Sequence, residues 1–433
     1  MDVKRSLRVI AGATLTGVLV CATAPNAAAD QVRDDQWALD YLEAESVWKI
    51  TKGKGQVIAV IDDGVNADHP DLKGNVLKGR DFIDGGGSGS PRGGANHGTA
   101  MAGIIAGHGH GPGNSAGVMG LAPEAKILPI RADGSDATGG ANAIKYAVDQ
   151  GASVINISQG GGIKTETEAE AIAYALRKNV PVFASTGNDG GAVEYPAAHP
   201  GVVPVGGVQR NGKIWKNSNR GKETLLTAPA VEVVTTGGAS DLNGYGIGDG
   251  TSDATAYASA AAALVRAKHP DLTAGQVVNR LTQTAQLPAG ENGAKVPDER
   301  YGYGSIRPLA ALQEDVPKGS KNGPLAVPEQ NAGQQTGSQK TEEDLALEKK
   351  QDREFVILWT ITGILAFLFV GAIVLTIVLV RRRKRNRNNG PGGPGAPGGY
   401  PYPPHQAPGY GMPQQQQPYG QQPTAPPQQP PYN

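Results

Sequence analysis

Five short apolar segments recur in the first half of this 433-residue chain, with helix-like segments between and after them. The apolar segments are rich in Val, Ile and Ala and cover residues 56–61, 127–131, 154–157, 180–184 and 202–208. Runs of this length and composition are typical of strands that are covered on both faces. The helix-like segments cover residues 99–106, 141–150, 166–178 and 253–268. The alternation predicts an α/β fold with three layers, a parallel sheet flanked by helices.

Three short motifs place a reactive side chain beside a glycine at a predicted strand end or helix start. Asp62 follows the first apolar segment, while His97 and Ser252 each precede a predicted helix. Each residue alone has an ordinary explanation, since Asp residues form turns and Ser residues begin helices. Together, a carboxylate, an imidazole and a hydroxyl are the three groups of a nucleophilic triad. The motifs occur in the order Asp, His, Ser, which is one of the known triad orders.

The residues around these positions carry a family resemblance. Asp-Asp-Gly at 62–64, His-Gly-Thr at 97–99 and Gly-Thr-Ser at 250–252 resemble the signatures of the subtilases, the subtilisin-like serine proteases. The resemblance covers roughly residues 35–315 and implies a subtilisin-like fold and a polypeptide substrate. In such an enzyme Asp62 orients His97, His97 acts as general base and then general acid, and Ser252 forms the acyl-enzyme.

Two further segments gain a role from the same resemblance. Asn188 lies in a Ser-Thr-Gly-Asn-Asp segment after a predicted strand and matches the side chain that completes an oxyanion hole. An Asn in such a turn is otherwise an ordinary loop residue. Ser158, Gln159 and Gly160 follow another predicted strand. They resemble the segment that pairs with an extended substrate and edges its specificity pocket.

A narrower resemblance is to the mycosins, the membrane-anchored subtilases of actinobacterial type VII secretion systems. Gln-Trp-Ala-Leu-Asp at 36–40 and Ala-Glu-Ser-Val-Trp at 44–48 resemble their N-terminal segment. This resemblance implies membrane components of such a system as partners. Only 32 residues, 30–61, separate the predicted signal cleavage site from Asp62, so we expect no folding-assistant propeptide. A shorter, autocleaved extension remains an open alternative.

Three positions depart from the family pattern. Asp63 replaces a small Ser or Thr, Asp253 stands where an apolar residue is common, and Ala256 replaces a Pro. A carboxylate beside Ser252 would disfavour a developing oxyanion, although the first turn of a helix stabilises an acid. An active enzyme is the favoured interpretation, and a catalytically weak or inactive scaffold of a secretion complex is the alternative.

Segments at both ends predict how the chain is placed in the cell. Residues 1–29 have the basic start, short apolar stretch and Ala-Ala-Ala end of a signal peptide. Residues 355–380 form 26 uncharged residues, long enough for one transmembrane helix. The sequence thus predicts an extracytoplasmic peptidase domain at 30–315 and a flexible stalk at 316–354. Residues 381–433 are predicted to form a basic collar and a disordered cytoplasmic tail rich in Pro, Gly, Gln and Tyr.

The zero net charge of the chain is the sum of segments that carry net charges of opposite sign. The segments 1–29, 30–380 and 381–433 carry +2, −8 and +6. An acidic exterior domain and a basic inner collar argue against nucleic acid as a partner and favour contact of the collar with the lipid bilayer. The only cysteine, Cys21, lies in the predicted signal peptide, so disulfides and thiol catalysis are excluded from the mature chain. A lipoprotein signal at Cys21 is the alternative, and the preceding Val20 disfavours it.

No metal or cofactor is predicted to be required. His108 and His110 in the Gly-rich loop 107–117 are the weak alternative, since two histidines without nearby carboxylates make a poor metal site. Calcium is frequent in subtilases, but the sequence does not place it. No Gly-rich stretch has the Lys and Ser/Thr of a phosphate-binding loop, which excludes that class of nucleotide enzyme.

Overall fold

The computed structural model of the protein describes residues 31–133, 137–237, 244–291 and 293–327, all within one compact unit. In this part of the chain, none of the helices combines the length and apolar character needed to cross a bilayer. The predicted signal peptide at 1–29, the predicted span at 355–380 and the predicted collar and tail at 381–433 lie outside the described residues.

Seven parallel strands form the central sheet, in the order β2-β5-β1-β6-β7-β8-β9. Their bounds are β1 Val57–Asp62, β2 Arg80–Asp81, β5 Lys126–Arg131, β6 Val154–Ile157, β7 Val182–Ser185, β8 Val202–Val208 and β9 Leu226–Pro229. In β1, Ile58 and Val60 belong to the core on one face and Ala59 and Ile61 to the core on the other. This two-sided burial explains the unbroken apolar runs. The predicted parallel sheet is confirmed, with strand ends that differ by up to two residues.

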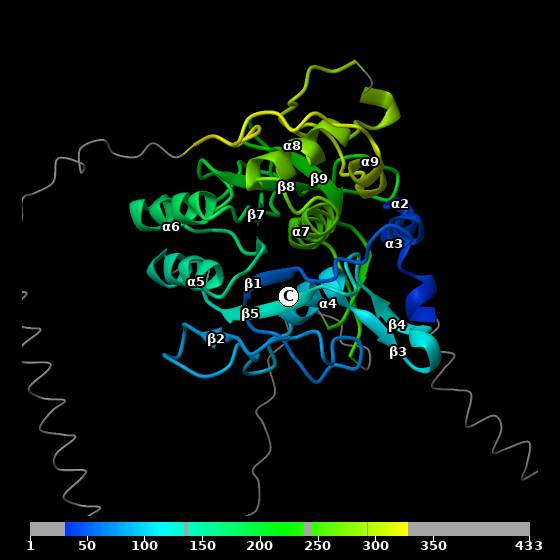
Figure 1. Ribbon diagram of the computed structural model, residues 1–433, viewed down its shortest axis with the longest axis vertical. Helices are drawn as coiled ribbons and strands as arrows, with labels where there is room; N and C mark the ends of the chain where they lie inside the picture. Colours follow the sequence, from blue (N-terminus) through cyan, green and yellow to red (C-terminus); the bar gives the residue numbers. More distant parts are fainter. Residues whose placement is uncertain (1–30, 134–136, 238–243, 292, 328–433) are drawn as a thin grey trace, which may run out of the picture. The chain divides into compact units, whose positions relative to one another are not determined.

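Helices cover both faces of this sheet (Figure 1). The four that flank it are α4 His97–Ala106, α5 Ala137–Asp149, α6 Glu166–Arg177 and α7 Thr251–Lys268. α5 and α6 pack together on one face, whereas α4 and α7 pack together on the other. The three predicted layers are therefore present. Three of these helices begin two to four residues earlier than predicted, because the Gly, Thr and Ser residues at their starts have low helix propensity.

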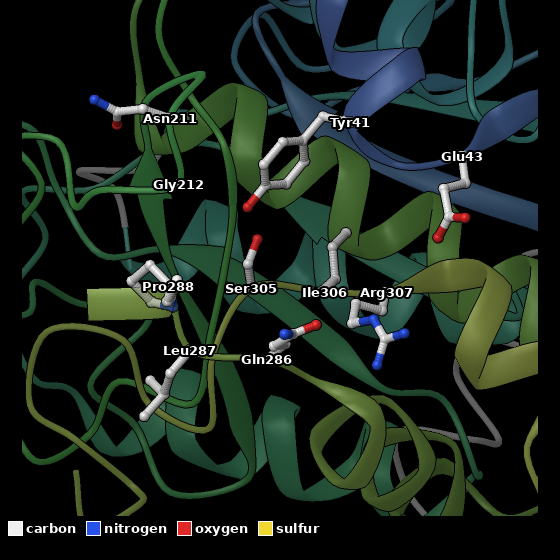
Figure 2. A pocket seen from close by; sticks show the side chains of 11 residues that line it. Tyr41, Glu43, Asn211, Gly212, Gln286, Leu287, Pro288, Ser305, Ile306 and Arg307 are labelled. Atoms are coloured by element: carbon white, nitrogen blue, oxygen red, sulfur yellow. The ribbon is translucent and has the colours of Figure 1, made fainter. Parts of the chain in front are cut away.

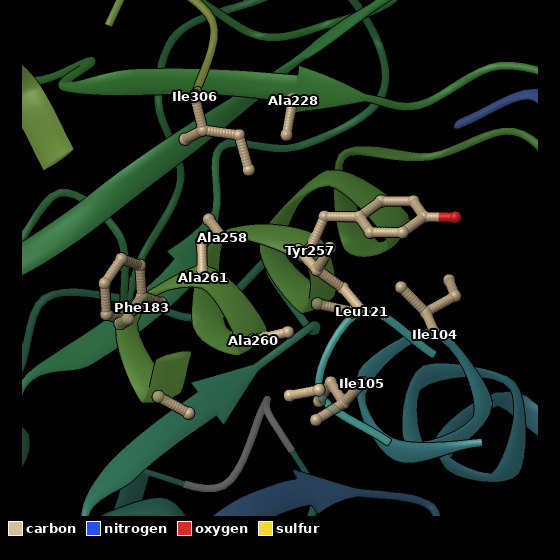
Figure 3. Packing of buried hydrophobic residues seen from close by; sticks show 14 of the residues in the cluster. Ile104, Ile105, Leu121, Phe183, Ala228, Tyr257, Ala258, Ala260, Ala261 and Ile306 are labelled. Carbon is tan, nitrogen blue, oxygen red and sulfur yellow. The ribbon is translucent and has the colours of Figure 1, made fainter. Parts of the chain in front are cut away.

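The central helix α7 is buried from its first residue to Val265, and most of its buried side chains are small. Figure 3 shows Tyr257 and the alanines of α7 between strands that carry Phe183 and Ala228 and the helix that carries Ile104. Small side chains allow a helix to approach a sheet closely, and the closely packed interior then fixes its position. The amino end of α7 carries Ser252, so this packing also fixes where that hydroxyl lies.

Several short elements lie outside the predicted segments. Besides β2 and β9, they are the paired strands β3 His108–His110 and β4 Ala116–Met119, the paired strands β10 Val233–Thr235 and β11 Gly246–Gly248, and the helices α2 Trp37–Tyr41, α3 Ala44–Trp48, α8 Ala274–Thr284 and α9 Pro308–Gln313. Most are too short to show a hydrophobic period. α8 begins with a capping box, a pattern that can be recognised in a sequence. Thr273 Oγ1 accepts from Gln276 N at 3.3 Å, and Gln276 Oε1 accepts from Thr273 N at 3.0 Å.

The N-terminal segment 31–52 is docked on the body of the domain. Gln36 makes two hydrogen bonds of 2.8 Å with the backbone N–H and carbonyl of Met119. Trp37 is 5% exposed, and its indole N–H donates to the carbonyl oxygen of Val231 at 3.1 Å. The segment is therefore bound by specific contacts that are distant in sequence.

The chain after α9 is also held against the domain. Arg280 of α8 donates to the carbonyl oxygen of Val316 at 3.3 Å, and Leu325 is 5% exposed within the core cluster. The prediction of a flexible stalk from residue 316 onward therefore does not hold for residues 316–325. The composition of this stretch is polar, and its order comes from α8 rather than from its own sequence pattern.

The strand order also indicates where a site can form. The chain passes from β1 to β5 on one side of β1 and returns to β6 on the other side. In parallel sheets, ligands bind beyond the carboxyl ends of the strands at such a reversal. Asp62 ends β1, and Ser158 directly follows β6, so both residues lie at this edge of the sheet.

Candidate active site

Asp62 and His97 are in direct contact. His97 begins α4, and its Nδ1 lies 2.8 Å from Asp62 Oδ1 and 3.0 Å from Oδ2. The Asp62 side chain is 1% exposed, whereas that of His97 is 43% exposed. A proton on Nδ1 directed at the carboxylate leaves Nε2 as the proton acceptor. A Cβ at Gly98 would lie 3.0 Å from Asp62 Cβ, so the glycine after His97 permits this close approach.

Asp63 caps the helix that carries His97. Its Oδ2 accepts from His97 N at 3.0 Å and its Oδ1 from Gly98 N at 2.7 Å. These donors belong to the first turn of α4, where backbone N–H groups have no partner within the helix. Burial, followed by the charge of Asp62, raises the pKa of Asp63, and the two backbone hydrogen bonds oppose that rise. This departure from the family pattern therefore has a structural role.

Ser252, the second residue of α7, is tied to Ser158. Its hydroxyl donates to the carbonyl oxygen of Ser158 at 2.9 Å, and the Ser158 hydroxyl donates to the carbonyl oxygen of Ser252 at 3.0 Å. Beneath them, Asn156 Nδ2 donates to Ser158 Oγ, and Ser259 Oγ donates to Asn156 Oδ1, both at 3.0 Å. A hydroxyl has one proton to donate. Ser252 must therefore redirect this proton away from Ser158 before it can donate to His97.

Asn188 is anchored beside the nucleophile by its amide oxygen. Asn188 Oδ1 accepts from the backbone N–H and from the hydroxyl of Thr251, both at 2.9 Å. The amide nitrogen, Nδ2, is not used in these two hydrogen bonds. A Cβ at Gly250 would lie 3.7 Å from Asn188 Nδ2 and 3.5 Å from Ser252 N. The nitrogens of two N–H groups thus lie near one point next to Ser252, which is compatible with an oxyanion hole.

Three carboxylates favour the protonated form of His97. The charge of Asp62 makes the largest contribution, burial opposes it, and the charges of Asp253 and Asp63 add to it, so that the pKa of His97 is raised to about 9. Burial raises the pKa of Asp253 to about 7, against the opposing charge of His97 and with a further rise from Asp249. The acidic residue after Ser252 is thus fully inside the domain and electrostatically coupled to the imidazole.

The predicted substrate-binding residues follow β6 toward the surface. Ser158 is buried beneath Ser252, Gly160 is exposed, and Gly162 forms an antiparallel bridge with Tyr195. The carboxylate of Glu194 lies against Gly160. Glu194 is not among the predicted site residues, because a single charged residue in a Gly-rich loop forms no recognisable motif.

The hollow drawn in Figure 2 is separate from these residues. It has a volume of about 400 Å³, and its lining includes Tyr41, Gln286, Pro288, Ser305 and Arg307 (Figure 2). None of the predicted catalytic or substrate-binding residues lines it. It therefore does not contribute to the candidate active site.

The two loop histidines make contacts within the protein. His108 Nδ1 lies 2.7 Å from the carbonyl oxygen of Gly109, and His110 Nδ1 lies 2.6 Å from Asp71 Oδ1. Among the residues that the structure describes, no group of three or more His, Cys, Asp or Glu side chains is placed to hold a metal ion. The alternative of a metal site at His108 and His110 therefore gains no support.

Taken together, the arrangement supplies the groups that acyl transfer needs. A buried carboxylate holds an accessible imidazole, a helix begins with a hydroxyl, and two donors flank the adjacent space. Such groups can remove a proton from a hydroxyl, stabilise the charge on an attacked carbonyl oxygen, and return the proton to a leaving group. Of the predicted residues, Asp62 contacts His97, Ser252 contacts Ser158, and Asn188 contacts the residue before Ser252.

Comparisons with known proteins agree with this geometry. Residues 53–304 match the model of the Subtilase family. The chain is 40% identical to a thermophilic serine proteinase of Bacillus sp. strain AK1 over 50% of this chain and 54% of the relative, so it spans about half of that relative's length. It is 32% identical to mycosin-1 of Mycobacterium tuberculosis over 71% of this chain and 80% of the relative.

A solved structure shows the same fold. The crystal structure of MycP1 from Mycobacterium smegmatis is 30% identical in sequence and superimposes with a TM-score of 0.58, covering 68% of this chain and 88% of that one.

Proposed function

Because this chain belongs to the subtilase family, we propose that it is a serine endopeptidase that hydrolyses peptide bonds through Asp62, His97 and Ser252. The observation that carries this proposal is the Asp62–His97 contact of 2.8 Å, beside a helix that begins with Ser252 and its two neighbouring N–H donors. The proposed reaction needs no cofactor or metal ion.

The proposed reaction begins with the rotation of the Ser252 hydroxyl from the carbonyl of Ser158 to Nε2 of His97. As Ser252 Oγ bonds to the substrate carbonyl carbon, its proton passes to His97, and Asp62 stabilises the resulting imidazolium. The carbonyl oxygen gains negative charge and accepts hydrogen bonds from Asn188 Nδ2 and Ser252 N. His97 then gives the proton to the leaving amine, and water hydrolyses the acyl-enzyme by the same steps.

The proposed substrate-binding segment is 158–160. An extended polypeptide can pair with exposed backbone along this segment, as in other complexes in which a peptide adds a strand to its receptor. Gly160 is exposed and carries no side chain that would hinder a close approach. Ser158, whose carbonyl oxygen accepts the hydrogen bond from the Ser252 hydroxyl, is the first residue of this segment and is buried.

We further propose that the enzyme is mycosin-like, with its peptidase domain outside the cytoplasmic membrane. The support is the similarity to mycosin-1 and to MycP1 of the ESX-1 type VII secretion system, together with the signal-like segment 1–29 and the apolar segment 355–380. Membrane components of such a secretion system and the lipid bilayer are the proposed partners. The basic residues at 381–387 support a cytoplasmic C-terminal side.

Labelling with a fluorophosphonate probe tests the catalytic proposal. The purified full-length chain should be labelled covalently, and Ser252→Ala should abolish labelling while leaving the thermal unfolding profile unchanged. Ser320→Ala is the control, since this exposed serine donates to the nearby carbonyl oxygen of Gly323 and has no contact with the residues of the proposed mechanism. A folded wild-type chain that neither reacts with the probe nor cleaves a peptide library would contradict the proposal and favour the scaffold alternative.

A further inference from the structure

We propose that Glu194 selects substrates with Arg or Lys on the amino side of the scissile bond. This inference rests on the proposed protease function and concerns the same site. Glu194 occupies the space between two glycines, Gly160 and Gly187, one from each segment that borders the proposed substrate position. It would therefore supply the floor of the specificity pocket with a negative charge.

The backbone holds Glu194 between these two segments. Glu194 N donates to the carbonyl oxygen of Thr186 at 3.0 Å, which ties it to the segment that ends in Asn188. The next residue, Tyr195, forms an antiparallel bridge with Gly162, which ties it to the segment after β6. The side chain is thus carried by a short connection that touches both sides of the proposed pocket.

The carboxylate itself lies against the two glycines. A Cβ at Gly160 would collide with Glu194 Oε2, whereas a Cβ at Gly187 would collide first with Asn219 Nδ2 and would lie 2.9 Å from Glu194 Cδ. A side chain at Gly160 would therefore displace the carboxylate, and one at Gly187 would displace Asn219 and crowd the carboxylate. Because both positions are glycine, the side chains of Glu194 and Asn219 lie against backbone there, and the Glu194 carboxylate is the charged group of the two.

The charge of Glu194 lacks a cationic partner. Asn219 Nδ2 donates to Glu194 Oε1 at 3.4 Å, a long hydrogen bond. In the part of the chain that the structure describes, every ion pair involves other carboxylates. A partly buried carboxylate without a cation favours a ligand that brings one, and a guanidinium matches its two oxygens.

The position of the reacting carbonyl connects this charge to one substrate residue. The carbonyl carbon must lie at Ser252 and its oxygen near Asn188. The side chain on the adjoining Cα, on the amino side of the scissile bond, then enters the space bordered by 158–160 and 187–188. Arg and Lys carry the positive charge that Glu194 would attract there, whereas an acidic side chain would be repelled by Glu194.

Peptide pairs that differ only in charge test this inference. With the full-length chain in detergent, kcat/KM for a fluorogenic peptide with Arg before the scissile bond should exceed that for the citrulline peptide, which has nearly the same shape without the charge, by about tenfold to a hundredfold. Glu194→Gln should bring the ratio close to one. Glu124→Gln removes one negative charge from an exposed turn before β5, at the opposite edge of the sheet, and should leave the ratio unchanged.

Binding to the Ser252→Ala chain separates recognition from catalysis. This variant cannot form an acyl-enzyme, so its Kd for the two peptides, measured by calorimetry, should show the same Arg preference and the same loss in a Glu194→Gln background. An Arg-to-citrulline ratio near one in the wild-type chain, or a ratio that Glu194→Gln leaves intact, would overturn the inference. Absence of hydrolysis together with a preserved Arg preference in binding would contradict the proposed function alone.

Discussion

At the level of single residues, the protonation state of His97 determines when Ser252 can react in the proposed mechanism. A general base must be neutral to accept a proton, and the carboxylates around His97 hold its pKa at about 9. As the pH falls through this value, His97 becomes protonated and kcat/KM should fall. Wild-type activity should therefore still be rising between pH 7 and 9.

Replacing Asp253 tests this electrostatic control. Asp253→Asn removes one of the negative charges that favour the protonated imidazole, so the pKa of His97 should fall. The acid limb of the pH profile should move to lower pH, and kcat/KM at pH 7, relative to its plateau, should rise by about threefold to tenfold. The measurement is kcat/KM for one peptide from pH 5 to 10, normalised by active-site titration.

Asp249→Asn is the control for this experiment. Asp249 lies three residues before Ser252 and accepts from Glu232 N at 2.7 Å, but it acts on Asp253 rather than on His97. Replacing Asp249 should leave the acid limb of the pH profile of kcat/KM nearly unchanged. A profile of Asp253→Asn that coincides with that of the wild type would show that Asp253 does not influence the base.

The site residues that could be predicted from the sequence are those that lie in a short sequence motif. Asp62, His97 and Ser252 each stand in a short pattern with glycine, and Asn188 follows a strand. The subtilase resemblance drawn from these motifs is confirmed by the family match. The role of Asp63 depends instead on contacts with His97 and Gly98, 34 and 35 residues away, and that of Glu194 on its place between Gly160 and Gly187, which no local pattern encodes.

At the level of elements, the amino end of α4 depends on Asp63. Asp63→Ala removes the acceptor of two backbone N–H groups, His97 N and Gly98 N. The free energy of unfolding should fall by about 1–2 kcal/mol, and kcat/KM should fall because His97 begins this helix. Urea unfolding followed by circular dichroism measures the first effect.

Asp63→Asn is the matched variant for the cap. Asn keeps one oxygen acceptor but has no charge, so it should recover part of the stability that Asp63→Ala loses. Equal unfolding midpoints for Asp63→Ala and the wild type would show that the cap does not stabilise α4.

The elements that the sequence predicted are those with long apolar or helical runs. The five predicted strands and four predicted helices are present because burial on both faces of a parallel sheet leaves a strong pattern. The paired strands β3–β4 and β10–β11 contain three or four residues each, several of them glycine. Their pairing depends on the surrounding structure, so their own sequences carry little signal.

At the level of the whole molecule, the proposed anchoring makes a prediction about fractionation. The full-length chain should remain with the membrane fraction in high salt, because an apolar segment rather than surface charge would hold it there. A chain that ends at residue 350 should be recovered in the soluble fraction and should react with the fluorophosphonate probe at the wild-type rate.

A variant with Gln at the six basic positions of 381–387 is the control, since it removes the collar charges and keeps residues 355–380. It should stay with the membrane fraction. Recovery of the chain ending at residue 350 in the membrane fraction after high-salt washing would contradict anchoring by this segment.

The docking of residues 31–52 and 316–325 on the domain has a consequence for self-digestion by the proposed protease. A protease in the same membrane as its copies meets their chains at high local concentration, and the bonds it cuts fastest lie in segments that detach readily. Residues 31–52 are held by Gln36 and Trp37, and residues 316–325 by Arg280 and Leu325. Either segment must leave its contacts before it can enter a neighbour's cleft. In the proposed membrane-anchored protease, these contacts would therefore lengthen the lifetime of the chain as well as stabilise its fold.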